Sequence, residues 1–173
     1  AQGLSDRSVY SLFEDREGSL WIGTTGGGLN RLKDGKFVTY GKSEGLADDM
    51  IFAVLEDRRG RVWVSTRSGV DRLENGRFSP LLLGPTLRDD PVWSLVEDAR
   101  GSVWAGSLGG RLGRFENQRW IPSTSPRDPQ GSTIAALFAD RDDSLWLGTL
   151  GGGLHRTRGG ISQDSYRIAE GLP

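Results

Sequence analysis

The chain has 173 residues, and its 22 lysines and arginines nearly balance its 23 aspartates and glutamates, for a formal net charge of −1. This balance provides no electrostatic attraction for nucleic acid or for an anionic membrane, so neither is expected as a partner. The absence of cysteine excludes disulfides, thiol catalysis and cysteine-bound zinc. No apolar run approaches the roughly 20 residues of a spanning helix, so this segment is not expected to insert into a membrane.

A ten-residue motif recurs four times along the chain. The segment DREGSLWIGT at 15–24 returns as DRRGRVWVST, DARGSVWAGS and DRDDSLWLGT. The repeated residues are Asp15, Asp57, Asp98 and Asp140 together with Trp21, Trp63, Trp104 and Trp146, and each series advances in steps of 42, 41 and 42. A period of about 40 to 45 residues is typical of propellers and solenoids. The repeat therefore defines the fold.

The first predicted strand of each repeat is apolar at nearly every position. These strands begin at Val9, Ile51, Val92 and Ile134, and their third places hold only small residues, namely Ser11, Ala53, Ser94 and Ala136. A strand that is apolar on both faces is expected to be buried on both faces. Small residues suit a crowded location near an axis, so we expect this strand to be innermost.

The Asp-x-x-Gly segment between the first and second strands predicts a tight hairpin turn. The aspartate carboxylate can accept backbone N–H bonds across the turn, and glycine can adopt the positive φ that a turn of this kind requires. The fourth copy has Asp143 in place of glycine, and aspartate tolerates that conformation. We expect the tryptophan that follows to pack against the next repeat and to donate its ring N–H to a carbonyl.

The third and fourth strands become steadily more polar. The third alternates, as in GVDRLE, and the fourth is amphipathic, as in KFVTYG, so burial is predicted to decline from the first strand to the fourth. Radial blades predict such a gradient, whereas no apolar pattern of 3.6-residue period supports a helical solenoid. We predict an all-β β-propeller with four four-stranded antiparallel blades. The single segment 1–173 then divides at approximately 3–44, 45–85, 86–127 and 128–171.

The first repeat, GLSDRSVYSLFEDREGSLWIGTTGGGLNRLKDGKFVTY, resembles the two-component regulator propeller repeat. Repeats of this family build the extracytoplasmic sensor regions of bacterial hybrid histidine kinases and of some diguanylate cyclases. The resemblance implies a periplasmic or extracytoplasmic, non-catalytic propeller that senses ligands, often glycan fragments, and signals inward. The final Gly171, Leu172 and Pro173 look like the start of a fifth repeat. We therefore expect the chain to be a fragment of a longer propeller.

Chain order places the loops before the first strand on the same face as the loops between the second and third strands. These loops differ from repeat to repeat, and variable loops on a repeated scaffold are where binding specificity can lie. Candidate hydrogen-bonding groups for sugar hydroxyls are Asp6, Arg7, Asp48, Asp49, Arg67, Arg88, Asp89 and Asp90. Candidate rings for stacking on a pyranose are Tyr10, Phe52 and Trp93. The alternative is that the charges are solvated and that the rings pack between blades.

Two further features have structural interpretations at this stage. Arginines recur in the third strand as Arg31, Arg72, Arg114 and Arg156, which predicts an ion pair or stem packing, with anion binding as the alternative. The single histidine, His155, is interpreted as a surface strand residue in preference to a general base, because no nucleophile or metal partner is evident beside it. No metal site and no cofactor is expected.

Three functional hypotheses follow from the sequence. The favoured one is a sensor segment that binds a small carbohydrate. The second is a scaffold for protein contact or dimerisation, and the third is a propeller lyase, which would need a histidine and carboxylates at the central channel. Four blades in an open arc would leave apolar sides exposed. We therefore expect either a homodimer that completes an eight-bladed ring or a monomer closed as a four-bladed propeller.

Overall fold

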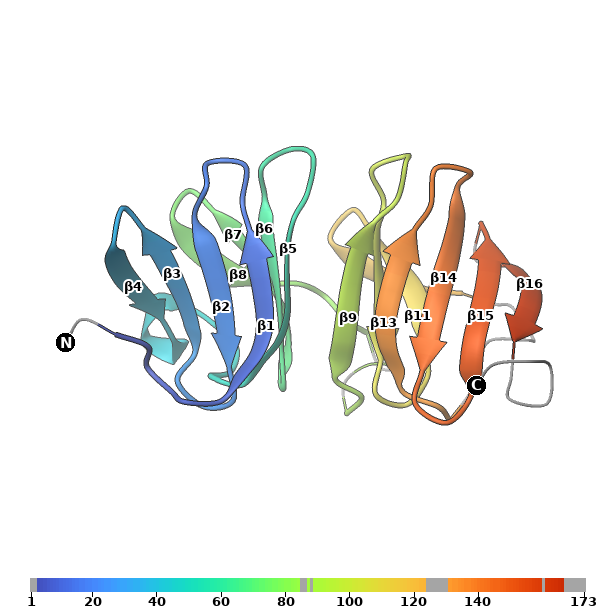
Figure 1. Cartoon of the computed structure of the whole chain (residues 1–173), viewed down its shortest axis with the longest axis horizontal. Helices are drawn as coiled ribbons and strands as arrows, with labels where there is room; N and C mark the ends of the chain where they lie inside the picture. The colour runs from blue at the N-terminus through green and yellow to red at the C-terminus, as the bar shows by residue number, and fades with distance from the viewer. Residues whose placement is uncertain (1–2, 85–86, 88, 124–130, 160, 167–173) are drawn as a thin grey trace. The chain divides into compact units, whose positions relative to one another are not determined.

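The computed structural model describes residues 3–84, 87, 89–123, 131–159 and 161–166, and these form sixteen strands in four sheets (Figure 1). The chain divides into two compact units, residues 1–83 and 84–173, and each contains two sheets. Within the described part of the chain, no helix has the length and apolar character to cross a membrane.

The first unit holds two sheets that follow each other along the chain. Blade 1 consists of β1 (Val9–Glu14), β2 (Leu20–Thr24), β3 (Leu29–Lys33) and β4 (Lys36–Tyr40). A short 3-10 turn, η1 (Lys42–Glu44), leads to blade 2, which consists of β5 (Ile51–Glu56), β6 (Val62–Thr66), β7 (Gly69–Glu74) and β8 (Arg77–Pro80).

The second unit repeats this plan. Blade 3 consists of β9 (Val92–Glu97), β10 (Val103–Ser107), β11 (Leu112–Glu116) and β12 (Arg119–Pro122). Blade 4 consists of β13 (Ile134–Ala139), β14 (Ser144–Thr149), β15 (Gly153–Arg158) and β16 (Ile161–Tyr166). In all four sheets the strands are antiparallel and lie in sequence order. The predicted architecture of four four-stranded antiparallel blades is confirmed.

Within each unit the core forms where one blade covers the tryptophan face of the blade before it. In the first unit, Trp21 and Leu29 of blade 1 pack with Ile51 and Val54 of blade 2. In the second unit, Trp104 of blade 3 packs in a cluster with three residues of blade 4, which are Ile134, Leu145 and Leu147. Burial of this apolar area is the main favourable term that holds neighbouring blades together.

The predicted burial order is wrong at its first step. The second strands are the most deeply buried, since every residue of β6 and β10 is buried, whereas β1 exposes much of its length, including Leu12 at 64%. The first strand is an edge of its sheet and has one hydrogen-bonded neighbour, whereas the second strand has a neighbour on both sides. Apolar composition alone did not reveal this difference.

All four first strands carry an irregularity at the same place. The pairing register shifts between Val9 and Ser11 in blade 1, and equivalent shifts occur in the other three blades. Each shift leaves one extra residue in the first strand, which is the arrangement of a β-bulge. The bulged residues are Tyr10, Phe52, Trp93 and Ala135. Three of the four are the rings singled out from the sequence.

Candidate functional site

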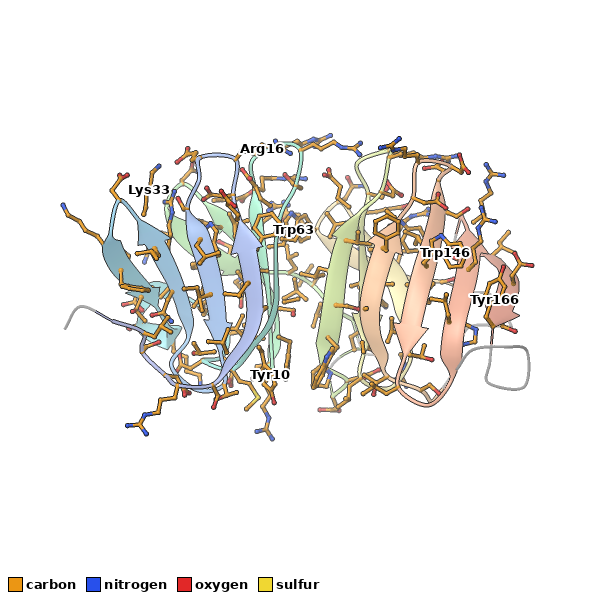
Figure 2. The ribbon with its side chains drawn as sticks, viewed as in Figure 1. Tyr10, Arg16, Lys33, Trp63, Trp146 and Tyr166 are labelled. Atoms are coloured by element: carbon orange, nitrogen blue, oxygen red, sulfur yellow. The ribbon has the colours of Figure 1, made fainter. Side chains whose placement is uncertain are left out.

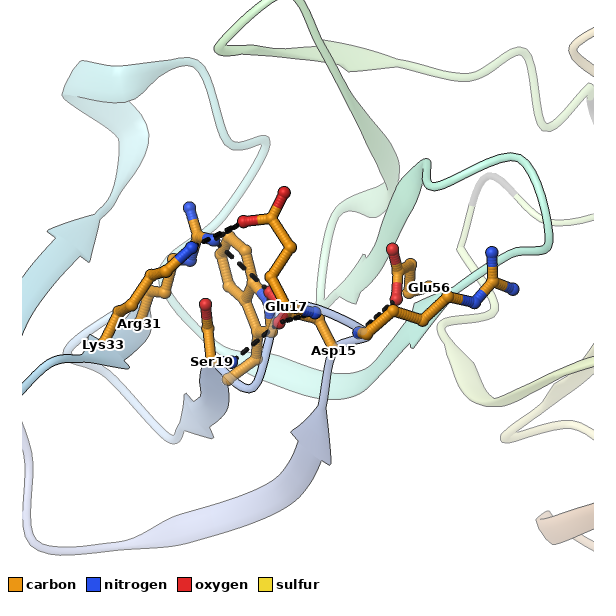
Figure 3. A network of polar contacts seen from close by, with 8 residues as sticks. Asp15, Glu17, Ser19, Arg31, Lys33 and Glu56 are labelled. Carbon is orange, nitrogen blue, oxygen red and sulfur yellow. Dashed lines mark hydrogen bonds and ion pairs between the residues drawn. The ribbon is translucent and has the colours of Figure 1, made fainter.

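The Asp-x-x-Gly hairpins occupy one end of each blade, which we call the turn end. In blade 1, Asp15 Oδ1 accepts the backbone N–H of Glu17 at 3.1 Å and of Ser19 at 2.7 Å (Figure 3). Asp15 Oδ2 accepts the indole N–H of Trp21 at 2.8 Å. One carboxylate therefore holds both the turn and the ring of the following strand. We call this arrangement the Asp–Trp clamp.

The same arrangement is present in every blade. The indole N–H of Trp63 reaches Asp57 at 2.8 Å, that of Trp104 reaches Asp98 at 2.7 Å, and that of Trp146 reaches Asp140 at 3.1 Å. The positive φ is supplied by Gly18, Gly60, Gly101 and Asp143, as predicted. The prediction that the indole donates to a carbonyl is wrong. The aspartate six residues before the tryptophan accepts the bond instead, because a charged carboxylate is a stronger acceptor than a neutral carbonyl.

These contacts control the charge state of the aspartates. Burial of Asp57 favours the neutral acid, but the Trp63 indole, the backbone N–H of Arg61 and the Arg61 guanidinium together hold its pKa below the usual value. Burial of Asp15 is offset in the same way, and its pKa is also lowered. The Asp15 and Asp57 carboxylates are therefore ionised hydrogen-bond acceptors throughout the neutral range.

The recurrent arginines lie over the tryptophans of their own blades. The guanidinium carbon of Arg31 lies 5.1 Å from the Trp21 ring centre, and in the later blades the corresponding distances are 5.5 Å for Arg72, 5.7 Å for Arg114 and 5.3 Å for Arg156. A cation within about 6 Å of an aromatic face is attracted to it. The prediction of structural packing is supported, with the aromatic ring as the partner.

The opposite end of each blade, which we call the loop end, carries the lead-in loop and the loop between the second and third strands. One aspartate joins the two loops in each of the first three blades. Asp6 accepts from Ser8 N and Thr25 Oγ1, both at 3.0 Å, and Asp48 accepts from Met50 N at 3.0 Å and Ser68 Oγ at 3.1 Å. In blade 3, Asp90 accepts from Ser107 Oγ at 2.7 Å and from Gly109 N at 2.6 Å.

These loop aspartates are three of the candidate ligand-binding residues. The backbone N–H of Ser8 and the hydroxyl of Thr25 lower the pKa of Asp6. Burial opposes ionisation of Asp48, yet its bonds to Met50 and Ser68 leave the pKa lowered. Their acceptor oxygens hold the loops in shape, so any contact to a ligand would have to use their remaining lone pairs.

The other predicted polar residues have fewer partners. Asp49 accepts the backbone N–H of Lys42 at 3.0 Å. Arg7, Arg67 and Asp89 are exposed, and their side chains form no hydrogen bond or ion pair with another described residue. Arg88 lies outside the described residues. Among the candidate residues that the structure describes, Arg7, Arg67 and Asp89 are therefore the exposed ones whose side chains have no such partner.

The bulged rings of the first unit meet at the loop end. The ring centres of Tyr10 and Phe52 are 5.9 Å apart at an interplanar angle of 39°, and Tyr10 is 52% exposed. Figure 2 shows Tyr10 at the end of β1 away from the Asp-x-x-Gly turn of Arg16. Trp93 belongs to the second unit and is partly buried. The structure thus brings Tyr10 and Phe52 of the first unit together.

His155 is not a surface residue, and this interpretation is corrected. It is 3% exposed, and its Nε2 lies 3.0 Å from the carbonyl oxygen of Gly152. It takes the buried β3-type position that holds Asn30, Asp71 and Gly113 in the other blades. No signal of this burial was present in the sequence, because the equivalent residues Asn30, Asp71 and Gly113 are not apolar. Among the described residues no cluster of three metal-ligating side chains is present.

Sequence profiles now identify the repeat. Residues 3–26, 45–68 and 86–109 match the profile of the two-component regulator propeller. Three of the four repeats are therefore two-component regulator propeller repeats. Each matched range runs from the lead-in loop through the Asp–Trp clamp to the loop between the second and third strands. None of the curated protein sequences matches the chain significantly.

Solved structures confirm the propeller fold. The extracellular domain assigned to a hybrid two-component system of B. thetaiotaomicron is 24% identical, with a TM-score of 0.70 over 86% of this chain and 20% of its own. Virginiamycin B lyase from Staphylococcus aureus is 16% identical, with a TM-score of 0.72 over 88% of this chain and 53% of its own. PorZ, a surface component of the type-IX secretion system of Porphyromonas gingivalis, is 15% identical, with a TM-score of 0.66 over 94% and 28%.

The chain spans between a fifth and about half of the length of these structures. At such identities the likeness is one of fold alone. The two-component regulator propeller repeats therefore have to be assigned a role from their own residues.

Proposed function

We propose that this chain is a non-catalytic, ligand-binding segment of an extracytoplasmic sensor propeller from a two-component-type receptor. The observation that carries the proposal is the contrast between the two ends of the blades. The turn ends use the same Asp–Trp clamp four times, which fixes the scaffold. The loop ends differ from blade to blade, and variable loops on a rigid scaffold are suited to recognition.

A small carbohydrate is the ligand class that best fits the loop end. In the first unit Arg7 and Arg67 are exposed donors for hydroxyl groups, and in the second unit Asp89 is an exposed acceptor. Tyr10 and Phe52 offer adjacent rings, one of them half exposed, against which the apolar face of a pyranose could stack. The bulges that hold these rings are devices that re-aim side chains next to functional sites.

The proposal is tested by titrating the chain with defined xylo-, manno-, arabino- and cello-oligosaccharides in isothermal calorimetry. Binding by one class is expected, and Tyr10→Ala and Arg67→Ala should each weaken it at least tenfold. Arg77→Ala, which removes an exposed arginine from the turn end, is the matched control and should leave the affinity unchanged. Equal losses in all three variants, or no binding by any oligosaccharide, would contradict carbohydrate recognition at the loop end.

A second proposed role is assembly with another set of blades. Within the first unit, blade 2 covers the Trp21 face of blade 1, but the opposite face exposes Leu12 at 64%. On blade 4 the tryptophan face bears Phe138, which pairs across the strands with Trp146 and is 64% exposed. One face therefore has the chemistry to receive a preceding blade and the other to receive a following blade.

We propose a second copy of the chain as the occupant of these two faces, because such contacts would repeat the packing already used between neighbouring blades. Light scattering behind a sizing column should then give the mass of a dimer, and Leu12→Glu should shift the mass to that of a monomer. Glu14→Gln, on the same strand, should not. A monomer at all concentrations would contradict this assembly and would favour closure of one chain on itself.

The lyase alternative lacks an accessible histidine in the described residues. His155 is buried and bonded to a backbone oxygen, so it cannot reach a substrate as a general base without a rearrangement of β15. The likeness to virginiamycin B lyase is confined to the fold.

A further inference from the structure

In blades 1 and 4 the outer strand places a tyrosine beside the blade's tryptophan. Tyr40 follows this rule in blade 1, where its ring stacks on Trp21 with centres 5.8 Å apart and an interplanar angle of 29°. In blade 4 the ring of Tyr166 stacks on that of Trp146, with ring centres 6.0 Å apart and an interplanar angle of 23° (Figure 2). A phenol ring on an indole is therefore a recurrent packing unit of this chain.

The pairing register identifies the same position in the other two blades. Tyr40 pairs with Leu29, and Tyr166 pairs with Leu154. The equivalent residues are Leu81, whose N–H is bonded to Val70 O at 2.8 Å, and Ser123, whose N–H is bonded to Leu112 O at 2.8 Å. Blade 2 thus fills the position with an aliphatic side chain, whereas blade 3 has only a serine.

A crevice lies beside Trp104 in blade 3, where this ring is replaced. It has a volume of about 260 Å³, and its apolar lining is provided by Trp104, Ile121, Pro122 and Ile161 together with the stem of Arg114. An engineered apolar cavity of about 150 Å³ is large enough to hold benzene. The crevice can therefore accommodate a substituted six-membered aromatic ring.

The crevice continues into a polar compartment between blades 3 and 4. This second part, of about 200 Å³, shares Trp104, Arg114 and Gly159 with the first and adds Glu116 and Asp143. The Oδ1 atom of Asp143 is buried and accepts no hydrogen bond from another described residue. Its other oxygen is held by Arg100, which bridges the turns of the two blades. A buried acceptor without a donor is costly, so this end favours a ligand that brings an O–H or N–H group.

We propose that this inter-blade crevice is a binding site for a small phenolic ligand. The ring occupies the place that Tyr40 and Tyr166 fill in their own blades, against Trp104, and the hydroxyl donates toward Asp143. The site is built by β12, by the turns at Asp143 and Gly159 and by Trp104 and Ile161, and it shares no residue with the candidate carbohydrate-binding residues. It is therefore independent of the carbohydrate proposal, and either can fail without the other.

The test uses p-cresol, the side-chain analogue of tyrosine, and the whole chain. Its titration is followed through the indole N–H resonances in nitrogen-15 correlation spectra, with Trp104 assigned from Trp104→Phe. We expect a saturable shift confined to Trp104, with a dissociation constant in the millimolar range or tighter. Ser123→Tyr should fill the crevice with the chain's own ring, weaken p-cresol binding at least tenfold and raise the melting temperature.

Two further comparisons keep the test decisive. Ser123→Leu copies the side chain of blade 2 and replaces the tyrosine variant if that one folds poorly. Asp143→Asn should weaken p-cresol but leave toluene binding unchanged, because toluene has no hydroxyl to donate. Uniform shifts of all tryptophans, or undiminished binding in both Ser123 variants, would overturn the proposal.

Discussion

Replacement of Asp57 by asparagine tests the clamp on which every blade depends. The carboxylate is fully buried and accepts four hydrogen bonds, from Arg59 N at 2.9 Å, Arg61 N at 3.0 Å, Arg61 Nε at 2.6 Å and Trp63 Nε1 at 2.8 Å. The variant keeps the shape of the side chain, but an amide NH₂ group replaces one of the two carboxylate oxygens. That NH₂ group then faces N–H donors from which it cannot accept a bond. At least one donor on that side loses its acceptor, and the remaining bonds lose their charge assistance.

Hydrogen bonds to a charged group contribute about 1.5 to 3 kcal/mol each, and a buried donor left unpaired costs about 1 to 3 kcal/mol. Because such effects are not additive, we expect Asp57→Asn to lower the free energy of unfolding by about 3 to 5 kcal/mol. At about 2 to 4 °C per kcal/mol for a chain of this size, the melting temperature should fall by roughly 10 °C. Urea unfolding followed by tryptophan fluorescence measures the change directly.

The control is Asp34→Asn, at the β3–β4 turn, where the backbone has φ of 50° and asparagine stands at the equivalent positions 75 and 117. This variant should be nearly as stable as the parent. The clamp also predicts a pH dependence. Because the folded pKa of Asp57 is lowered, its contribution is present above the unfolded value of 3.8 and is lost as the pH falls through the folded pKa. The reasoning would be refuted if Asp57→Asn lowered the free energy of unfolding by less than about 1 kcal/mol. It would also be refuted if Asp57→Asn and Asp34→Asn lost stability equally as the pH falls.

Two other substitutions have effects that follow from close packing and from burial. Gly23→Ala would place a Cβ 2.7 Å from Ile51 Cγ2 between blades 1 and 2. Calorimetry should therefore show a free energy of unfolding that is lower by about 1 to 3 kcal/mol. Gly148→Ala, whose Cβ has its nearest contact at 3.5 Å, should be tolerated, and equal losses would contradict the packing argument. Burial raises the pKa of Asp71, whose Oδ1 has no hydrogen-bond partner among the described residues, so its ionisation destabilises the fold as the pH rises. Asp71→Asn should therefore be more stable than the parent by about 1 to 3 kcal/mol at neutral pH. Below pH 3.8 this advantage should disappear, because Asp71 is then neutral in both the folded and the unfolded chain. A stability difference that did not change with pH would contradict a destabilising charge at Asp71.

The repeat made the architecture predictable because spacing and turn chemistry are local properties of the sequence. The Asp-x-x-Gly turn needs a short acceptor and a residue that tolerates positive φ, and both are visible in the letters at 15–18 and at the three later copies. The candidate site was predictable only in part. Tyr10 and Phe52 do meet, but Asp6 and Asp48 are engaged in holding their loops. Their partners come from the loop after the second strand, 19 and 20 residues further on.

By itself the sequence determined the blade, because a turn, a strand and a hydrophobic pattern repeated four times leave few ways to pair neighbouring strands. Only the tertiary structure decided which donors the aspartates capture, how deeply His155 is buried and where a ring is replaced by Ser123. These features depend on contacts between strands and between blades, where the partner is set by register and packing. A residue's own type and its nearest neighbours in the chain do not contain that information.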